Sequence, residues 1–221
     1  MLRAALIAIA VLLCTSAGAT PVPIFAHTPY TTDARISDFG YTGGVNEQAD
    51  GFLLSQARTI RGLVFWGAYN AVTSDDFTVR VFADLGTELL NPIGPKSAAD
   101  YESQFSALTR VDTGDDFGGA DIFRYSANLA SPMPLANDTN YYLSIVNNTS
   151  NETYWSWALR DAADGDRWNR SPSTDWALQA DADMAFEIYA TQVVPVPVPT
   201  TLALFALGIA GVGMSRLRRK A

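Results

Sequence analysis

The sequence has a single cysteine and a single histidine among its 221 residues. With Cys14 alone, no disulfide can form within the chain. Any Ser-His-Asp arrangement would depend on His27, which lies close to Pro29 near the amino end, where we expect disorder. The same shortage excludes zinc sites built from Cys and His, and no Gly-rich loop precedes a helix as phosphate binding requires. Nucleophilic, zinc-dependent and nucleotide-dependent catalysis are therefore not expected.

Basic residues are also few, with 15 Lys and Arg against 23 Asp and Glu. Five of the basic residues lie near the two ends of the sequence, and every acidic residue lies between them. This leaves 10 basic against 23 acidic residues in the middle part, a net charge of about −13. Such a surface repels nucleic acid, so we expect no nucleic-acid partner, and it suits a soluble extracellular domain.

The first residues have the three parts of a secretory leader. Arg3 gives a positively charged start, residues 4–13 are apolar, and Ala17 and Ala19 supply the small residues of a cleavage site. We therefore expect a signal peptide at residues 1–19, with signal peptidase and the export machinery as partners. The exported chain would begin at Thr20.

A lipoprotein leader is the alternative for the same segment, because Cys14 follows Val11-Leu12-Leu13. Lipid attachment needs a small residue just before the cysteine, and Leu13 is not small. We therefore favour the cleaved leader. An exported chain that begins at Thr20 holds no cysteine, so its fold depends on a hydrophobic core alone.

Residues 20–191 are long enough for one domain with a sizeable core, and no linker divides them. Apolar and polar residues alternate in short runs, as at Phe77, Val79 and Val81, and helical periodicity is almost absent. We expect strands at residues 58–66, 76–83, 107–112, 122–129, 141–146, 154–159 and 184–189. Roughly eight to ten strands at this spacing predict an all-β fold, an antiparallel β-sandwich of jelly-roll type.

Three stretches are predicted to interrupt the strands. Residues 97–105 are expected to form a helical turn or an irregular excursion, and residues 113–116 a turn. Pro132 and Pro134 are expected to bridge the strand at residues 122–129 to a turn at residues 137–140.

Acidic residues are plentiful enough that two kinds of site have to be weighed. A glycosidase needs two carboxyl groups across a cleft, but the acids here fall mostly in turns, so we expect no catalysis and keep a carbohydrate-active enzyme as an alternative. Asp161, Asp164 and Asp166 surround Gly165 and offer oxygen ligands to calcium, without the full spacing of an EF-hand loop. A solvated turn is the favoured interpretation there, and likewise for a second cluster at residues 112–121.

Four of the five tryptophans fall in the last quarter of the domain. Trp155 and Trp157 share one face of a predicted strand, where paired rings are more often core than ligand platform. Trp168 and Trp176 lie in a loop-rich segment and are the better candidates for exposure. The alternative is a carbohydrate-binding surface formed by these four rings, which would make the protein a sugar- or calcium-binding adhesin.

The last thirty residues consist of three segments that differ in composition. Residues 192–201 are Pro-rich, which holds the chain extended, residues 202–215 are apolar, and residues 216–221 are basic. We expect a transmembrane helix over residues 202–215, although its apolar run rises only roughly 20 Å against a hydrocarbon core of about 30 Å. The basic tail would stay in the cytoplasm; its charged residues are Arg216, Arg218, Arg219 and Lys220.

This arrangement resembles the bacterial PEP-CTERM sorting signal, which has a short Pro-containing motif, an apolar helix and an Arg-rich end. The corresponding motif residues are Val196, Pro197, Val198, Pro199 and Thr200. Val198 stands where the family usually has Glu. The resemblance implies an exosortase-type sorting enzyme as a partner and a transient hold in the inner membrane. An ordinary, permanent single-pass anchor is the alternative.

The domain itself also resembles a β-sandwich module of exported PEP-CTERM proteins. The likeness lies in aromatic residues and alternation at residues 59–69, 76–82, 141–145, 155–157 and 184–189. It implies a surface or extracellular-matrix protein associated with exopolysaccharide or biofilm, without an assigned activity. We therefore expect an exported, membrane-sorted, non-catalytic protein that needs no cofactor, with polysaccharide as a further candidate partner.

Overall fold

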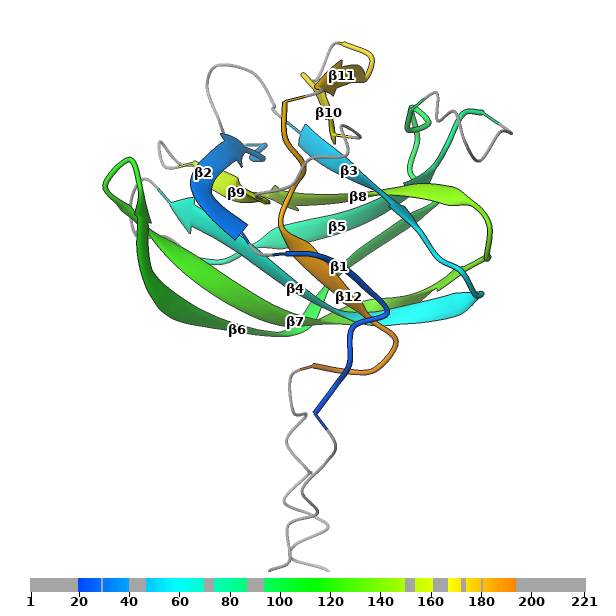
Figure 1. Ribbon diagram of the computed structural model, residues 1–221, viewed down its shortest axis with the longest axis horizontal. Helices are drawn as coiled ribbons and strands as arrows, with labels where there is room; N and C mark the ends of the chain where they lie inside the picture. Colours follow the sequence, from blue (N-terminus) through cyan, green and yellow to red (C-terminus); the bar gives the residue numbers. More distant parts are fainter. Residues whose placement is uncertain are drawn as a thin grey trace, which may run out of the picture.

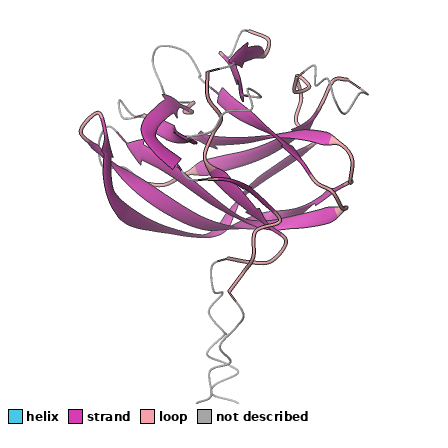
Figure 2. Cartoon of the chain, in the orientation of Figure 1, coloured by secondary structure: helices cyan, strands magenta, loops and turns pink. Residues whose placement is uncertain are grey.

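The computed structural model describes residues 20–28, 30–39, 47–69, 74–86, 94–149, 154–160, 167–171, 174–179 and 181–193. These residues form twelve strands and no helix (Figures 1 and 2). No helix that would span a membrane occurs in these ranges. The expected signal peptide at residues 1–19 and the expected transmembrane helix at residues 202–215 lie outside them.

The strands are β1 (Phe25–His27), β2 (Tyr30–Ile36), β3 (Glu47–Leu53), β4 (Arg58–Tyr69), β5 (Phe77–Ala83), β6 (Tyr101–Phe117), β7 (Ala120–Leu135), β8 (Asn140–Asn147), β9 (Trp155–Arg160), β10 (Arg167–Arg170), β11 (Ala177–Gln179) and β12 (Phe186–Tyr189). Every pairing between them is antiparallel, in the order β1-β12-β4-β7-β6-β5-β8-β3-β10-β11, with β9 joining β2 to β4. The predicted all-β, antiparallel class is confirmed, and the jelly-roll arrangement stays a prediction.

Two layers face each other across the hydrophobic core (Figure 1). One layer holds β12, β4, β7 and most of β6, and the other holds β5, β8 and β3. β6 belongs to both, because residues 101–104 pair with β5 and residues 105–117 pair with β7. The predicted alternation is confirmed in β5 and β7, whose Val79, Val81, Tyr125 and Ala127 are fully buried in this core.

β4 is the centre of the first layer. Along one side it pairs with β7, and along the other it pairs first with β12 and then with β9. Phe65 of β4 stacks on Tyr125 of β7 with ring centroids 4.8 Å apart, and its edge meets Trp155 of β9. Because these rings bury large apolar areas, they supply the core that a chain without disulfides needs.

Of the three predicted interruptions, the one at residues 97–105 is too long, the one at Pro132 and Pro134 is wrong, and the one at residues 113–116 is misplaced. Residues 101–105 belong to β6, and β7 continues through Pro132 and Pro134 to pair with the start of β4. The β6–β7 turn lies at Gly118 and Gly119 instead of residues 113–116. Their φ angles of 58° and 86° match a two-residue hairpin turn that favours glycine, and Gly114 (φ 82°) lies where the β6–β7 register shifts.

Gly67 of β4 provides a test of this packing. A Cβ at this position would lie 2.5 Å from the ring of Trp155 and 2.6 Å from the carbonyl oxygen of Ser156. We expect Gly67→Ala to lower the free energy of unfolding by about 3 kcal/mol, since the buried ring has to shift. Gly114→Ala is the control, because nothing lies within 4 Å and only its backbone strain, about 1 kcal/mol, is added. Urea unfolding of both variants measures the difference, and equal costs would contradict this packing.

Candidate functional site

Both ends of the described chain leave the domain on the same side. β1 pairs with β12 in antiparallel register, and the Ile24 amide donates a hydrogen bond to the Ile188 carbonyl at 2.8 Å. In Figure 1 the blue chain before β1 and the orange chain after β12 both extend below the layer that contains β4 and β7. The segment that follows Val193 therefore starts from the outer face of this layer.

Val193 is held firmly at that face. Its amide donates a hydrogen bond to Oδ1 of the buried Asn128 at 2.8 Å. Its side chain packs over Gly62 of β4, where a Cβ would meet both of its methyl groups at 3.2 Å. Val193 also contacts the outer-face cluster that includes Val64 and Ala68. The fold thus fixes the chain two residues before Pro195, the first proline of the Pro-rich segment.

The single histidine is not disordered as expected. His27 is 4% exposed in β1, and its Nδ1 lies 2.9 Å from Oδ2 of Asp50, a fully buried residue of β3. The Met184 amide also donates to Oδ2, at 3.0 Å, whereas Oδ1 has no hydrogen-bond partner among the described residues. Burial raises the pKa of Asp50 to about 6, with the charge of Asp183 adding to the rise and His27 and the Met184 amide opposing it. This contact ties β1 to the core.

The other buried charges also link strands. Glu47 at the start of β3 is 1% exposed and accepts hydrogen bonds from Ser144, Arg80 and Arg170. Arg167 of β10 is 2% exposed and donates to the side chain of Gln48 at 2.8 Å. A buried charge is costly unless it is paired, so these contacts fix β10 against β3. The arrangement serves structure, and it commits the Glu47 carboxylate to two arginines.

The structure places Trp155 and Trp157 inside the core. Both are fully buried, and the indole of Trp157 donates to the Ala185 carbonyl at 2.9 Å. Neither ring offers a face to a sugar in this fold, so the interpretation of this pair as core holds and the glycan platform loses two of its four members. The reason is that β2 and β4 flank β9 on both sides, while the opposite layer covers its inner face.

Trp168 and Trp176 are half-buried and cover the outer face of the second layer. The indole of Trp176 donates to the Lys96 carbonyl at 3.0 Å, and the guanidinium of Arg170 lies 4.4 Å from the centre of its ring. The ring of Trp168 packs against Gly94 and meets Tyr142 edge-on. Both rings are therefore occupied in holding β10 and β11 on the sheet. Contact between glycan and the exposed parts of these two rings stays a prediction.

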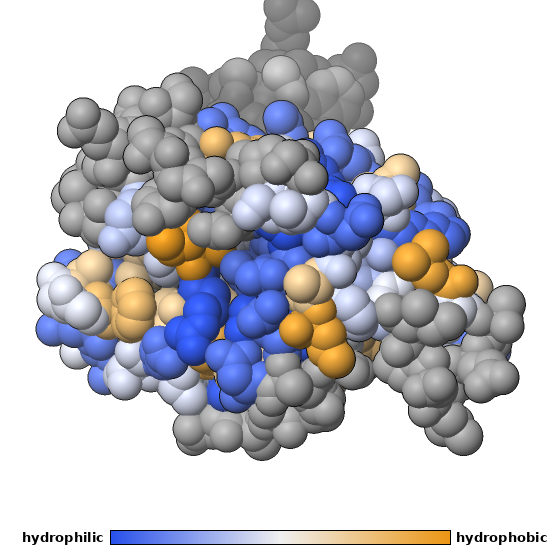
Figure 3. Space-filling view, turned by 90° about the horizontal axis from the view of Figure 1, so that it is seen from above, coloured by the Kyte–Doolittle hydropathy of each residue, from blue (hydrophilic) through white to orange (hydrophobic). Residues whose placement is uncertain are grey.

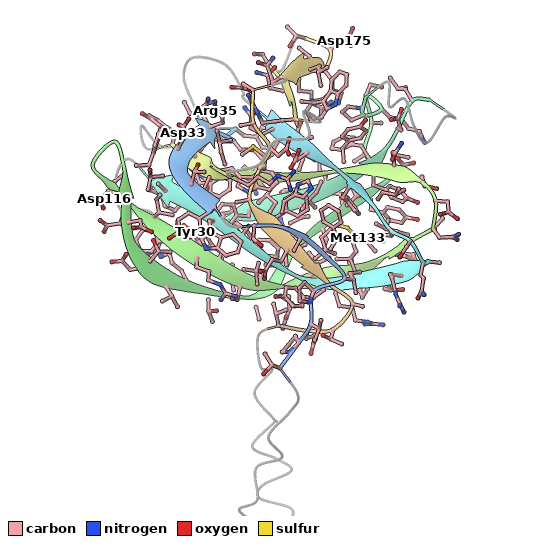
Figure 4. The ribbon with its side chains drawn as sticks, viewed as in Figure 1. Tyr30, Asp33, Arg35, Asp116, Met133 and Asp175 are labelled. Carbon is pink, nitrogen blue, oxygen red and sulfur yellow. The ribbon has the colours of Figure 1, made fainter. Side chains whose placement is uncertain are left out.

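The acidic clusters gather no metal site in the part that the structure describes. Asp161, Asp164 and Asp166 lie outside the described residues, so calcium binding there stays a prediction. In the second cluster, Asp115 accepts a hydrogen bond from Tyr30, and Asp116 lies near the β6–β7 tip (Figure 4). Among described residues, no group of three or more His, Cys, Asp or Glu is placed to hold a metal ion.

The buried Asp50 carboxyl gives the fold an unusual dependence on pH. Its pKa is raised from 3.8 to about 6, so this group stabilises the fold fully below about pH 4 and loses that contribution as the pH rises through about 6. The loss is up to about 3 kcal/mol. Between about pH 4 and pH 7, we expect the Tm of the unmodified chain to fall relative to the Tm of Asp50→Asn, which lacks the titrating carboxyl. The Tm of Asp175→Asn, at an exposed position, should change with pH as that of the unmodified chain does. Thermal unfolding across this range measures the difference, and a constant difference would contradict it.

Comparison with known protein families identifies the segment that follows Val193. No curated protein and no solved structure matches the chain. Residues 195–220 match the family model described as the PEP-CTERM protein-sorting motif, and the match begins two residues after Val193. Such a motif implies export, membrane anchoring through the sorting signal and processing by an exosortase-type enzyme. The chain therefore carries a PEP-CTERM sorting motif at residues 195–220, consistent with a PEP-CTERM protein.

Proposed function

We propose that this is an exported, non-catalytic protein of the cell surface or extracellular matrix, associated with exopolysaccharide or biofilm. After a transient hold in the inner membrane, an exosortase-type enzyme would cut the chain and release the β-sandwich domain. The observation that carries the proposal is the sorting motif itself, which follows β12, the last described strand of the domain. The motif determines delivery, and the domain is what is delivered.

The short distance between domain and motif supports this order of events. Val193 is bound to the sheet, and only residues 194–201 separate it from the apolar run. Alternating prolines favour an extended chain of about 3.1 Å per residue, so this segment reaches about 25 Å. A membrane enzyme that binds the Pro-containing motif would therefore meet an extended chain, with the folded domain held just outside the bilayer.

The charged residues support a role without catalysis. A glycosidase needs one carboxyl with a raised pKa next to a second carboxyl across an open cleft. Asp50 has a raised pKa, but it is fully buried and contacts His27. Glu47 is buried as well and is bound by two arginines. We therefore favour a matrix or surface component over a carbohydrate-active enzyme.

The processing step is tested by the mass of the mature chain. We expect the protein from cells that contain an exosortase-type enzyme to end within or near residues 195–201. From cells that lack the enzyme, the protein should keep Ala221. Intact-mass spectrometry of the surface and medium fractions distinguishes the two forms. Surface protein that keeps Ala221 despite an active enzyme would contradict processing and indicate a permanent anchor.

Two variants make this test specific to the motif. Pro197→Ala with Pro199→Ala should lower the processed fraction, and Val198→Glu, which restores the residue usual in the family, should raise it. Pro21→Ala is the matched control, because this proline lies in the exported chain but outside the motif. Equal processing of all forms would show that these residues are not recognised.

A further inference from the structure

The basic residues of the domain fall into two groups. Ten Lys and Arg lie in the described residues, and seven of them form ion pairs with Asp or Glu. Arg58, Arg61 and Arg124 form no ion pair within the ranges that the structure describes, and all three lie in β4 or β7. In a domain with a net charge of about −13, cations without a carboxylate partner are unexpected. Because all three lie in two adjacent strands, we looked for a partner of these arginines outside the domain.

Two of these arginines lie on the outer face of the β4–β7–β6 layer. Arg124 follows the inward-facing Phe123 in β7, and its guanidinium lies over Trp66 at 5.8 Å from the ring centre. Arg61 is exposed and adjacent to Gly62, which contacts Val193. Arg58 is exposed at the start of β4. Arg61 therefore lies next to the point where the chain leaves the domain, and Arg124 lies farther along the same face.

Three described groups near these arginines on this face are apolar or already hydrogen-bonded. Val111 is 61% exposed in β6 and lies directly opposite Arg124 in the sheet. Glu187 accepts a hydrogen bond from Tyr189 at 2.5 Å, and Asp115 accepts one from Tyr30. In this part of the face two cations balance two hydrogen-bonded carboxylates, so it lacks the net negative charge that repels an anionic bilayer elsewhere on the domain.

The chain itself brings this face to a membrane. The sorting motif implies membrane anchoring, and residues 194–201 reach at most about 28 Å beyond Val193. Part of this length crosses the headgroup layer, so little remains to hold the domain away from the bilayer. The opposite face, seen in Figure 3, has a hydrophilic region in its middle with separate hydrophobic patches around it, and it points away from the exit point.

We propose that the outer face of the β4–β7–β6 layer is a lipid-contacting surface, on which Arg61 and Arg124 bind anionic headgroups and Val111 enters the interface. The inference rests on the membrane anchoring in the proposed function and adds an orientation to it. While anchored, the domain lies on the bilayer and presents β10, β11 and the half-buried tryptophans to the outside. Contact with lipid would also keep the Pro-containing motif close to the membrane.

The orientation is tested with the full chain in vesicles of phosphatidylcholine and phosphatidylglycerol that carry a headgroup quencher. Cys14→Ser combined with Val111→Cys places a single fluorophore on the proposed surface. Leu85→Cys is the matched control, because Leu85 is also 61% exposed but follows β5 in the opposite layer. We expect quenching at position 111 and little at position 85. Equal quenching at both, or none at position 111, would overturn the inference.

The charge dependence gives a second readout. Arg61→Gln with Arg124→Gln should lower the ratio of docked to undocked domain about fivefold per arginine in phosphatidylglycerol vesicles. Arg35→Gln is the control, because Arg35 of β2 already forms ion pairs with Asp33 of the same strand and with Asp181, which follows β11. Flotation with the vesicles is measured in parallel. If the chains float but position 111 is quenched no more than position 85, the docked orientation alone is refuted. If the chains fail to float, membrane anchoring is contradicted, and the docked orientation is contradicted with it.

Discussion

The antiparallel pairing of β1 with β12 determines how the domain is attached to the rest of the chain. It brings the first and last described strands together next to β4 and sends both ends out over one face. Val193 is then held by Asn128 and Gly62, so the sorting motif begins from a fixed point. If Val193 were not held there, the motif would follow a loose end and the domain would have no defined orientation at a membrane.

A core without disulfides has to define its strand pairing by other means. The aromatic rings around Phe65 and Trp155 supply the apolar burial, and buried charges fix the register of strands that apolar contacts do not distinguish. Glu47 joins β3 to β5 and β10 through arginines, and Asp50 joins β3 to β1 through His27. Such pairs add little net stability, but removing one partner leaves a buried charge alone. Glu47, Asp50 and His27 are residue types that also occur in catalytic sites, but their contacts here join strands.

The sequence predicted the parts of the fold whose residues alternate cleanly. β5 and the first half of β7 were accessible in this way, and the sorting motif was accessible from local composition alone. β3 was missed because Glu47 and Asp50 are polar residues that become buried only through distant partners. His27 was expected to be disordered for the same reason, since its partner lies 23 residues away. The turn at Gly118 was misplaced because an acidic stretch upstream has similar turn character.

The central claim is that the carboxyl-terminal motif, and no property of the domain alone, delivers this protein to the membrane. The most direct measurement compares the full chain with a chain that stops after Val193, by fractionation of the producing cells. We predict that the full chain, in cells lacking the sorting enzyme, is found in the membrane fraction. The shortened chain should be exported in soluble form and should keep the thermal transition of the domain. Membrane association that survives the loss of residues 194–221 would contradict the account.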